Sequence, residues 1–599
     1  MIGLLIIVYF VEIGSSASVE NSYRSPWHYK CEGGLCKKEL IRNETSPVPL
    51  EVCELFCDAS SSLWPKPTGH LSLSRNMVHL DPEKISLSDA PSGTRVGYLL
   101  ETNINLLRQK AKNVAGRLTE SGGTGMLVRL MGLVESDPVK LTLSTDESYT
   151  LNVIQANNTW LETTITAKSY FGARHALETL SQMIVFDEYR DQIQIPKEIS
   201  ITDGPTYPYR GLLLDTSRNF IAKSKILETI DGMAMSKLNT LHWHIVDSQS
   251  FPYVSRTWPK FSTYGCYSAD KIYEEKDIRE IVEYGIVRGV RVLPEFDAPA
   301  HVGEGWQWAG NDTIVCFKAE PWKSYCVEPP CGQLNPTSDK VYELLEGIYR
   351  DMLRDFQPDL FHMGGDEVNL NCWNSSVVIR KWMQEVKGWD LTERSFYMLW
   401  DYFQERASEK LRLANEGTDI PIVLWTSGLT NQQNIHRLDP DKYIVQIWTS
   451  KDDPTVATLL RNNFRVIFSN YDALYLDCGF SAWIGEGNNW CSPYKGWQII
   501  YDNSPSKIIR SQRFENKRHL VLGGEAALWT EQADSVSLDS KLWPRSAALA
   551  ERLWAEPNST WIHAEHRMLR HRERFVRRGI AANALQPEWC TQNQGHCYA

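Results

Sequence analysis

The sequence lacks the features of membrane-spanning, nucleic acid-binding and metal- or nucleotide-dependent proteins. Beyond the first eleven residues, no apolar run approaches the roughly 18 residues that would span a bilayer. The chain carries 63 basic and 74 acidic residues, a net charge of −11 and no Lys- and Arg-rich run, which argues against a nucleic acid partner. It contains no CxxC pair, no HExxH motif and no GxGxxG motif after a strand-like run. We therefore expect no membrane span, no metal and no other cofactor.

The start of the chain indicates export. Residues 2–11 form an apolar run that is too short to span a bilayer, and small residues follow at positions 15–18. This pattern predicts a signal peptide over residues 1–17. Thirteen cysteines favour an oxidising compartment, so we expect a secreted, extracellular protein, with the lysosome as the alternative. Five N-glycosylation acceptor sequences agree with this route, at Asn43, Asn157, Asn311, Asn374 and Asn558.

Residues 18–204 predict a smaller α+β domain with a disulfide-stapled start. Four cysteines cluster near its beginning, at positions 31, 36, 53 and 57. Strand-like runs at 141–144 and 149–153 alternate with helical patterns at 104–118 and 173–185. A turn-rich junction at residues 203–208 then predicts a domain boundary between residues 204 and 205.

Residues 205–599 predict a (β/α)8 TIM barrel, which gives the chain an α/β fold class. Buried strand-like runs recur eight times, at 211–215, 240–246, 291–296, 360–364, 422–426, 443–448, 465–469 and 520–525. Amphipathic helical patterns lie between several of them, at 225–237, 277–288, 340–356, 393–411 and 454–463. A doubly wound sheet is the alternative. It is disfavoured because six strands would suffice and no strand leads into a GxGxxG motif.

Most of the remaining cysteines lie close to a partner in sequence. Cys316 and Cys372 could join across the top of the barrel, which leaves Cys266 unpaired. Pairing within the N-terminal cluster stays open. Three further pairs would each close a short loop: Cys326 with Cys331, Cys478 with Cys491, and Cys590 with Cys597.

Polar and aromatic residues lie at or directly after the end of every predicted barrel strand. In a TIM barrel the chemistry takes place at the carboxyl ends of the strands, so we expect these side chains to surround one pocket. A single charge in such a place is usually an ordinary loop residue, but here all eight strand ends carry one or more candidates. The candidates are Arg218, Asp247, His301, Asp366, Glu367, Trp425, Trp448, Tyr475, Asp477, Trp529 and Glu531.

The string Gly364-Gly365-Asp366-Glu367 places two adjacent acids at the end of the fourth strand. Two carboxyl groups in different surroundings can divide the work of glycoside hydrolysis, one anionic and the other protonated. We expect Glu367 to be the general acid and Asp366 the ionised partner. An Asp-Glu pair in a solvated turn is the alternative.

Other candidates have roles that the same chemistry suggests. His301 and Asp247 could form a relay behind Glu367, or each could be a hydrogen-bonded structural residue. Arg218 could hold two sugar hydroxyls with its planar fork, or pair with an acid of the barrel. Tyr475 could donate its phenol to a carbonyl oxygen, and Trp425, Trp448 and Trp529 could wall a sugar pocket.

Several separate motifs resemble family 20 glycoside hydrolases, the β-N-acetylhexosaminidases. They are the strings at 210–218 (RGLLLDTSR), 242–244 (HWH), 295–297 (EFD), 364–367 (GGDE), 542–545 (LWPR) and 550–554 (AERLW). The resemblance implies exo-acting, retaining hydrolysis in which the 2-acetamido group of the substrate attacks the anomeric carbon. Asp366 and Tyr475 would then hold that group, and Arg218, Asp477 and Glu531 would bind hydroxyls. It also implies a homodimer.

Within this family the chain resembles the arthropod enzymes that cleave chitooligosaccharides. The similarity lies in the insert at 326–331, with Val327 and Glu328, and in Trp490, residues that would hold the next sugar. We expect terminal β-N-acetylglucosamine to be removed from chitooligosaccharides and also from N-glycans. Two alternatives are a broad-specificity lysosomal-type hexosaminidase and a catalytically silent carbohydrate-recognition glycoprotein. A nucleotide cyclase is disfavoured by the export signal, and an endo-acting chitinase by the missing DxxDxDxE pattern.

Overall fold

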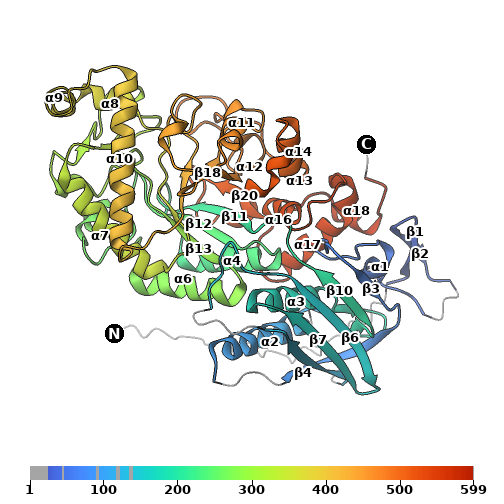
Figure 1. Cartoon of the computed structure of the whole chain (residues 1–599). Helices are drawn as coiled ribbons and strands as arrows, with labels where there is room; N and C mark the ends of the chain where they lie inside the picture. The colour runs from blue at the N-terminus through green and yellow to red at the C-terminus, as the bar shows by residue number, and fades with distance from the viewer. Residues whose placement is uncertain (1–24, 43–45, 89–92, 117–121, 134–138, 598–599) are drawn as a thin grey trace, which may run out of the picture.

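The computed structural model describes residues 25–42, 46–88, 93–116, 122–133 and 139–597. The predicted signal peptide lies outside these residues. A barrel with surrounding helices forms the larger part of the molecule, and a sheet with two helices packs against one side of it (Figure 1). Within the described residues no helix is both long and apolar enough to cross a membrane.

Eight parallel strands close into the predicted barrel. Each strand pairs with the next in chain order, and the last pairs with the first. All eight predicted strands are present; the fourth is only two residues long, and the eighth continues three residues further than expected. The strands are β11 (Tyr209–Asp215), β12 (Thr240–His244), β13 (Arg291–Glu295), β16 (Phe361–His362), β17 (Ile422–Trp425), β18 (Tyr443–Ile447), β19 (Arg465–Phe468) and β20 (Val521–Leu528).

Helices surround the barrel, and the five predicted ones are present within three residues at either end. They are α4 (Lys223–Met235), α6 (Glu275–Arg288), α7 (Asp339–Phe356), α10 (Glu393–Ala414) and α11 (Pro454–Arg461). Local sequence sets the limits of α6: Glu274 and Asp277 form a capping box, and Gly289 ends the helix with a φ of 73°. The others are α5 (Lys260–Gly265), α8 (Leu370–Ser375), α9 (Val377–Lys381), α12 (Tyr471–Leu474), α13 (Trp497–Asp502), α14 (Pro505–Ser511), α15 (Leu538–Leu542), α16 (Arg545–Ala555) and α17 (Glu565–Val576). The last helix, α18 (Glu588–Gln592), packs against the N-terminal segment of the chain instead (Figure 1).

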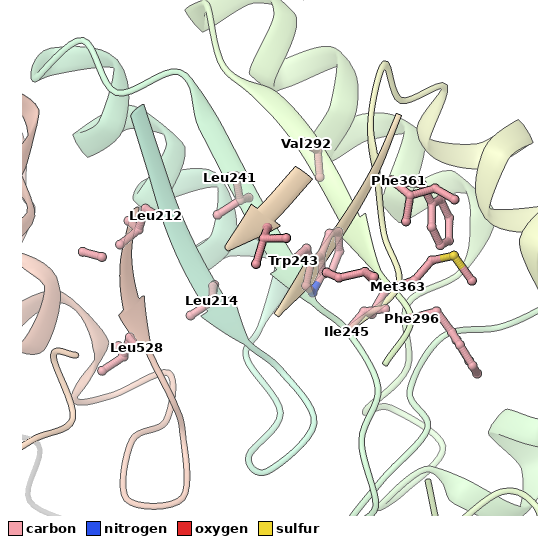
Figure 2. Packing of buried hydrophobic residues seen from close by; sticks show 14 of the residues in the cluster. Leu212, Leu214, Leu241, Trp243, Ile245, Val292, Phe296, Phe361, Met363 and Leu528 are labelled. Carbon is pink, nitrogen blue, oxygen red and sulfur yellow. The ribbon is translucent and has the colours of Figure 1, made fainter. Parts of the chain in front are cut away.

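Alternation along the strands separates an apolar outer layer from a partly polar interior. Leu212 and Leu214 of β11 join Leu241 and Trp243 of β12 in the core between strands and helices (Figure 2). Leu213 faces the other way and belongs to a separate cluster inside the barrel. The inner positions of β12 and β13 therefore bring titratable side chains into the barrel, below the site.

The smaller domain contains an eight-stranded mixed sheet with order β3-β10-β6-β7-β5-β4-β9-β8. Its strands are β3 (Leu71–Leu73), β4 (Met77–Ser88), β5 (Thr124–Met131), β6 (Tyr149–Asn157), β7 (Trp160–Ala167), β8 (Val185–Asp187), β9 (Gln192–Pro196) and β10 (Ile199–Asp203). A separate two-stranded sheet, β14 (Ile314–Val315) and β15 (Gln333–Leu334), lies between barrel strands β13 and β16 in the chain. Since β10 ends at Asp203 and β11 begins at Tyr209, we propose the link between them as the domain boundary.

Helices α2 (Arg95–Asn113) and α3 (Tyr170–Gln182) attach this sheet to the barrel. Asn103 and Tyr170 both donate hydrogen bonds to the carbonyl of Val287 on α6, at 3.0 and 2.7 Å. The predicted helices were shifted: α2 begins nine residues earlier than position 104, and α3 three residues earlier than 173. Thr94 and Ser169 cap these helices, and both caps precede the apolar periodicity on which the predictions depended.

The predicted strand at 141–144 is wrong, because this segment forms a turn. The Thr145 hydroxyl accepts a hydrogen bond from the Thr142 amide at 2.9 Å, and the Thr145 amide donates to the Thr142 carbonyl. A side-chain hydroxyl that bonds to nearby backbone competes with a sheet ladder, and here it prevails over the apolar alternation.

Six disulfides are present, and the expected pairs at 316/372, 326/331, 478/491 and 590/597 are confirmed. The N-terminal cluster resolves into Cys31–Cys57 and Cys36–Cys53. These two bonds join the hairpin of β1 (Trp27–Glu32) and β2 (Leu35–Leu40) to α1 (Leu50–Cys57). Cys266 is free, as expected.

Candidate active site

A cavity of about 190 Å³ opens at the carboxyl ends of the barrel strands. Every predicted site residue lines it except Trp425, so the ends of seven of the eight barrel strands contribute to one pocket. The predicted residues on its wall are Arg218, Asp247, His301, Val327, Glu328, Asp366, Glu367, Trp448, Tyr475, Asp477, Trp490, Trp529 and Glu531.

The two glycines after β16 allow the chain to turn into this cavity. Gly364 has a φ of 60° and Gly365 a φ of 84°, which L-residues adopt at a cost. A Cβ at position 364 would lie 1.9 Å from a carboxylate oxygen of Asp297, so only glycine fits. The Gly365 amide donates to that same oxygen at 2.8 Å. Asp297 therefore fixes the turn that delivers Asp366 and Glu367 to the pocket.

His301 lies between the adjacent acids and Asp247. Its Nε2 is 3.2 Å from a carboxylate oxygen of Glu367 and 3.7 Å from one of Asp366. Its Nδ1 lies 3.3 Å from Asp247. The predicted association of Glu367, His301 and Asp247 is thus present as a continuous row of contacts.

Burial and neighbouring charges shift the pKa values in this row. Burial lowers the pKa of His301, but the carboxylates of Asp247, Asp297 and Asp366 outweigh it and hold that pKa well above its ordinary value. The imidazole is therefore a cation. Burial also raises the pKa of Asp366 to about 6, opposed by His301 and assisted by Glu367. Near neutral pH Asp366 is mostly ionised, as its predicted role requires. One buried oxygen of Asp366 forms no hydrogen bond among the described residues.

Arg218 sits at the side of the cavity with acids on both sides of its guanidinium. One terminal nitrogen is 2.9 Å from Asp247, and the other is 2.6 Å from Glu328. Burial lowers the pKa of Arg218, but these acids and Asp215 outweigh it and raise it well above its usual value. Arg218 therefore pairs with acids, as one of its two predicted roles has it, and also borders the cavity. Its binding of sugar hydroxyls stays a prediction.

Asp477 and Glu531 are the two other carboxyl groups on the wall. Burial raises the pKa of Asp477 to about 7 and that of Glu531 well above its ordinary value, against the attraction of Arg218. One oxygen of Asp477 is buried and unbonded among the described residues. Such groups are costly to leave unpaired, so they are ready to bond to a polar ligand.

Aromatic rings surround the rest of the pocket. Trp490 lies 5.0 Å from Tyr471 and 6.1 Å from Tyr475, ring centre to ring centre, yet it is 64% exposed at the rim. Burial raises the pKa of the Tyr475 phenol well above its usual value, so its hydroxyl stays a donor. Trp425 lies below the pocket instead of lining it: it is buried, packs 6.0 Å from Trp529 and donates to Glu295 at 2.7 Å.

Sequence reasoning did not single out Trp483 and Ile484, which also line the cavity. Both are exposed and lie inside the loop that the Cys478–Cys491 disulfide closes. Trp490 belongs to the same loop. The position of Trp483 and Ile484 between the paired cysteines and close to Trp490 was therefore a signal that could have predicted their place in the cavity. His244 and Asp297, the last residues of the HWH and EFD strings, also line the cavity but were not among the predicted site residues.

A network of histidines and carboxylates fills the barrel below the cavity. Glu295 contacts His244 at 2.5 Å, His242 at 3.0 Å and His362 at 3.1 Å. His244 then contacts Asp247 at 2.8 Å, which links the network to the site. The donor atoms of His242, Glu295 and His362 lie within 4.8 Å of one another, a spacing that a metal could use. Glu295 already accepts a hydrogen bond from Trp425 and is bonded to His244, and burial lowers the pKa of His362. We therefore assign the cluster as a network of hydrogen bonds and ion pairs centred on Glu295.

Comparison with known proteins gives the same family as the sequence motifs, glycosyl hydrolase family 20, and the similarity extends over almost the whole chain. Residues 207–557 match the glycosyl hydrolase family 20 catalytic domain, and residues 63–183 match a domain described as beta-acetyl hexosaminidase like. The chain is 50% identical to the chitooligosaccharidolytic beta-N-acetylglucosaminidase of Ostrinia furnacalis, over 96% of both chains. It is 48% identical to the protein of the same name from Bombyx mori, over 98% of both chains.

A solved structure shows the same fold at low sequence identity. The Flavobacterium johnsoniae chitobiase superposes with a TM-score of 0.68 at 23% identity, covering 87% of this chain and 73% of that one. Barrel, small domain, adjacent acids and sequence similarity all agree with the resemblance found in the motifs. The chain belongs to glycosyl hydrolase family 20 and is a hydrolase of the β-hexosaminidase type.

Proposed function

We propose that this enzyme removes terminal, non-reducing β-N-acetylglucosamine from chitooligosaccharides, with retention of anomeric configuration. The observation that carries the proposal is the placement of Asp366 and Glu367 side by side on one cavity, with cationic His301 in contact with both. The cavity volume of about 190 Å³ fits one sugar rather than a long chain, which favours exo-action. N-glycan ends are a second substrate that the same pocket could accept.

The mechanism needs no nucleophile from the enzyme. The carbonyl oxygen of the 2-acetamido group attacks the anomeric carbon, while Glu367 protonates the departing glycosidic oxygen. Asp366 accepts a hydrogen bond from the acetamido N–H and stabilises the positive charge of the oxazolinium ion. Tyr475 donates to the acetamido oxygen and so holds it in place. Glu367 then takes a proton from the water that attacks the anomeric carbon and opens the oxazolinium ring. Each of the two steps inverts the anomeric carbon, so the product retains the original configuration.

Polar groups at the sides of the pocket would bind the sugar hydroxyls. Asp477 is a buried acceptor and Glu531 a partly buried one, and Arg218 offers donors in a planar fork. Trp448 and Trp529 offer apolar faces to the sugar ring, and Trp425 supports Trp529 from below. At the rim, Val327, Glu328 and Trp490 are placed to contact the next sugar.

A catalytically silent sugar-binding protein would use the same pocket without the acid pair. Retention of both Asp366 and Glu367, together with Asp247 and His301, supports catalysis instead. The six disulfides support passage through an oxidising compartment, and we propose secretion. A homodimer stays a prediction, as do a lysosomal location and the absence of a nucleic acid partner.

Substrates with a fluorinated acetamido group test this mechanism directly. Fluorine withdraws electrons and weakens the acetamido oxygen as a nucleophile, so kcat should fall steeply from N-acetyl through N-monofluoroacetyl to N-trifluoroacetyl aryl glycosides. Relative kcat/KM on chitobiose, an N-glycan end and an N-acetylgalactosaminide then defines the substrate class. A kcat that does not respond to fluorination would overturn the substrate-assisted mechanism, and absent turnover of chitobiose would overturn the substrate.

A further inference from the structure

A second cavity, of about 330 Å³, lies between the small domain and the barrel, away from the active site. Its walls come from α2 and α3 on one side and from α4, α6 and α17 on the other. In Figure 1 these helices lie where the small domain meets the barrel. No residue is shared between the linings of the two cavities.

The lining of this cavity is cationic in a chain that is acidic. Seven Lys and Arg side chains and five Asp and Glu side chains border it, against a net charge of −11 for the whole protein. A positive cavity in a negative molecule concentrates anions from solution. The excess of cations therefore needs a reason beyond ordinary surface pairing.

Glu178 is the carboxylate shared by the cations at the centre of the cavity. Its Oε2 lies 2.5 Å from the Lys110 ammonium and 3.3 Å from the Arg174 guanidinium. Arg578 approaches the same carboxylate closely enough to lower the pKa of Glu178. Arg578 is exposed, and its guanidinium forms no ion pair or hydrogen bond with the described residues, although its backbone N–H donates to the Phe575 carbonyl. One buried acid thus faces three cations, and at least one guanidinium retains all its donors.

Nearby Arg574 is also without an acidic partner in direct contact. Its guanidinium donates to the Ser62 carbonyl at 2.8 Å and to the Ser62 hydroxyl at 3.2 Å, both neutral groups. Burial and the repulsion of other cations lower the pKa of Lys110 to about 7 and that of Arg574 to about 9. Burial is the larger cause of both shifts, and the neighbouring cations Arg578 and Arg570 add to it.

We propose that this interdomain cavity binds a tetrahedral oxyanion, phosphate or sulfate, through Arg578, Arg174 and Lys110. Guanidinium groups match such oxygens with paired, charge-assisted hydrogen bonds, and an ammonium adds a point charge. The anion occurs free or as an ester on a sugar, and the chemistry recognised is the same. Because Arg578 follows α17 of the barrel and Lys110 and Arg174 belong to α2 and α3, a bound anion also joins the two domains.

Binding of inorganic phosphate, inorganic sulfate and glucose 6-phosphate to the whole protein tests this site. Calorimetric titration in a chloride buffer should show saturable binding of at least one of the three, and that anion should raise Tm. If only glucose 6-phosphate binds, the natural ligand is an ester; if the inorganic anions bind equally well, it is the free ion.

Arg578→Gln should weaken binding about tenfold, because a charged hydrogen-bond donor to the anion is lost. Arg578→Lys should retain part of the affinity, and Arg412→Gln, an exposed residue paired with Glu409, is the matched control. Turnover of chitobiose should be the same in all three variants, which separates this site from the active site. Absence of saturable binding for every anion, or equal binding by wild type and Arg578→Gln, would overturn the proposal.

Discussion

His301 and Glu367 face each other across the active site with 3.2 Å between imidazole Nε2 and carboxylate oxygen, and both have left-handed backbone conformations. Their φ angles are 55° and 50°, which non-glycine residues adopt only when the surroundings enforce it. The contacts of His301 with Asp247, and of Asp247 with His244 and Arg218, supply that enforcement. The orientation of the acid is thus fixed from the interior of the barrel.

Replacement of the general acid should separate chemistry from folding. Glu367→Gln keeps the size of the side chain but cannot protonate the leaving group, so kcat on chitobiose should fall about 10²–10⁴-fold. The loss should be smaller for an aryl glycoside whose leaving group departs as an anion. Steady-state kinetics on both substrates measure this, with Tm as the test of folding. An equal loss on both substrates would remove Glu367 from the role of acid.

The pH dependence of kcat/KM should report Asp366. This carboxyl has a pKa of about 6 in the unliganded protein, and its ionised form is the one that binds the acetamido N–H. The acidic limb of kcat/KM should therefore lie near pH 6, since this constant reports the free enzyme. His301 is the cation that lowers the pKa of Asp366, so His301→Gln should raise it and move the limb to higher pH.

The matched control for this shift is His436→Gln, because His436 is exposed and does not line the cavity. Its pH profile should equal that of the wild type. A profile of His301→Gln that keeps its midpoint while kcat falls would mean that His301 acts on Glu367 alone.

Trp490 should matter for long substrates and little for short ones. Its ring is 64% exposed at the rim of the cavity, where a second sugar could stack on it. Stacking contributes about 1 kcal/mol, so Trp490→Ala should reduce kcat/KM for chitotriose about fivefold. An aryl N-acetylglucosaminide should be almost unaffected. Trp589→Ala is the control: it removes a similarly exposed indole from α18 and should leave kcat/KM unchanged for both substrates. If Trp490→Ala reduced kcat/KM equally for both substrates, Trp490 would not belong to the second subsite.

Ionisation of Asp477 should lower the free energy of unfolding as the pH rises. Burial raises its pKa in the folded protein to about 7, so the folded state favours the protonated carboxyl. Its contribution to stability is present in acid and is lost as the pH rises through about 7. The side chain of Asp477→Asn cannot ionise. The Tm of this variant minus the Tm of the wild type should therefore increase by about a few degrees from pH 5.5 to pH 8.5.

The same variant should lose substrate affinity, because an acceptor for a sugar hydroxyl becomes an amide. Asp452→Asn, at a 69% exposed side chain, is the control and should show no pH-dependent gain in Tm. A constant Tm difference for Asp477→Asn across the pH range would show that Asp477 ionises normally in the folded protein.

The barrel could be predicted because its signal is local and repeated. Each buried strand is short and apolar, each helix has a 3.6-residue period, and the site residues follow the strands directly. The position of Asp366 and Glu367 at the end of a strand could be predicted in the same way, because Gly364 and Gly365 directly precede them in the sequence. The small domain was harder, since β4 and β5 pair in parallel and only tertiary contacts define their register.

The contacts inside the barrel could not be read from sequence. His242, Glu295 and His362 come from three strands, and nothing in their spacing says that they meet. Trp425 is the last residue of β17 and Trp448 is the first residue after β18, but a hydrogen bond to Glu295 holds Trp425 below the cavity. Its position depends on a partner that lies 130 residues away along the chain.

Gly364 is the position at which one methyl group should disable the site. A Cβ there would lie 1.9 Å from the Asp297 carboxylate and 2.7 Å from the Asp297 Cα, so backbone as well as side chain would have to move. Added to the cost of a left-handed alanine, Gly364→Ala should destabilise the protein by about 2–4 kcal/mol.

Activity of this variant should fall about 10²-fold or more, because the turn sets the positions of Asp366 and Glu367. Gly388→Ala is the matched control: its φ is 66°, close to the 60° of Gly364, but no atom lies within 4 Å of the added Cβ. It should therefore cost only the backbone strain, about 1–2 kcal/mol, with kcat unchanged. Thermal unfolding and the kinetics of chitobiose hydrolysis are measured for both variants. The difference between the variants gives the effect of the clash with Asp297, because both carry the same backbone strain. Equal stability and equal activity in both would mean that Asp297 yields to the methyl group and does not fix the turn.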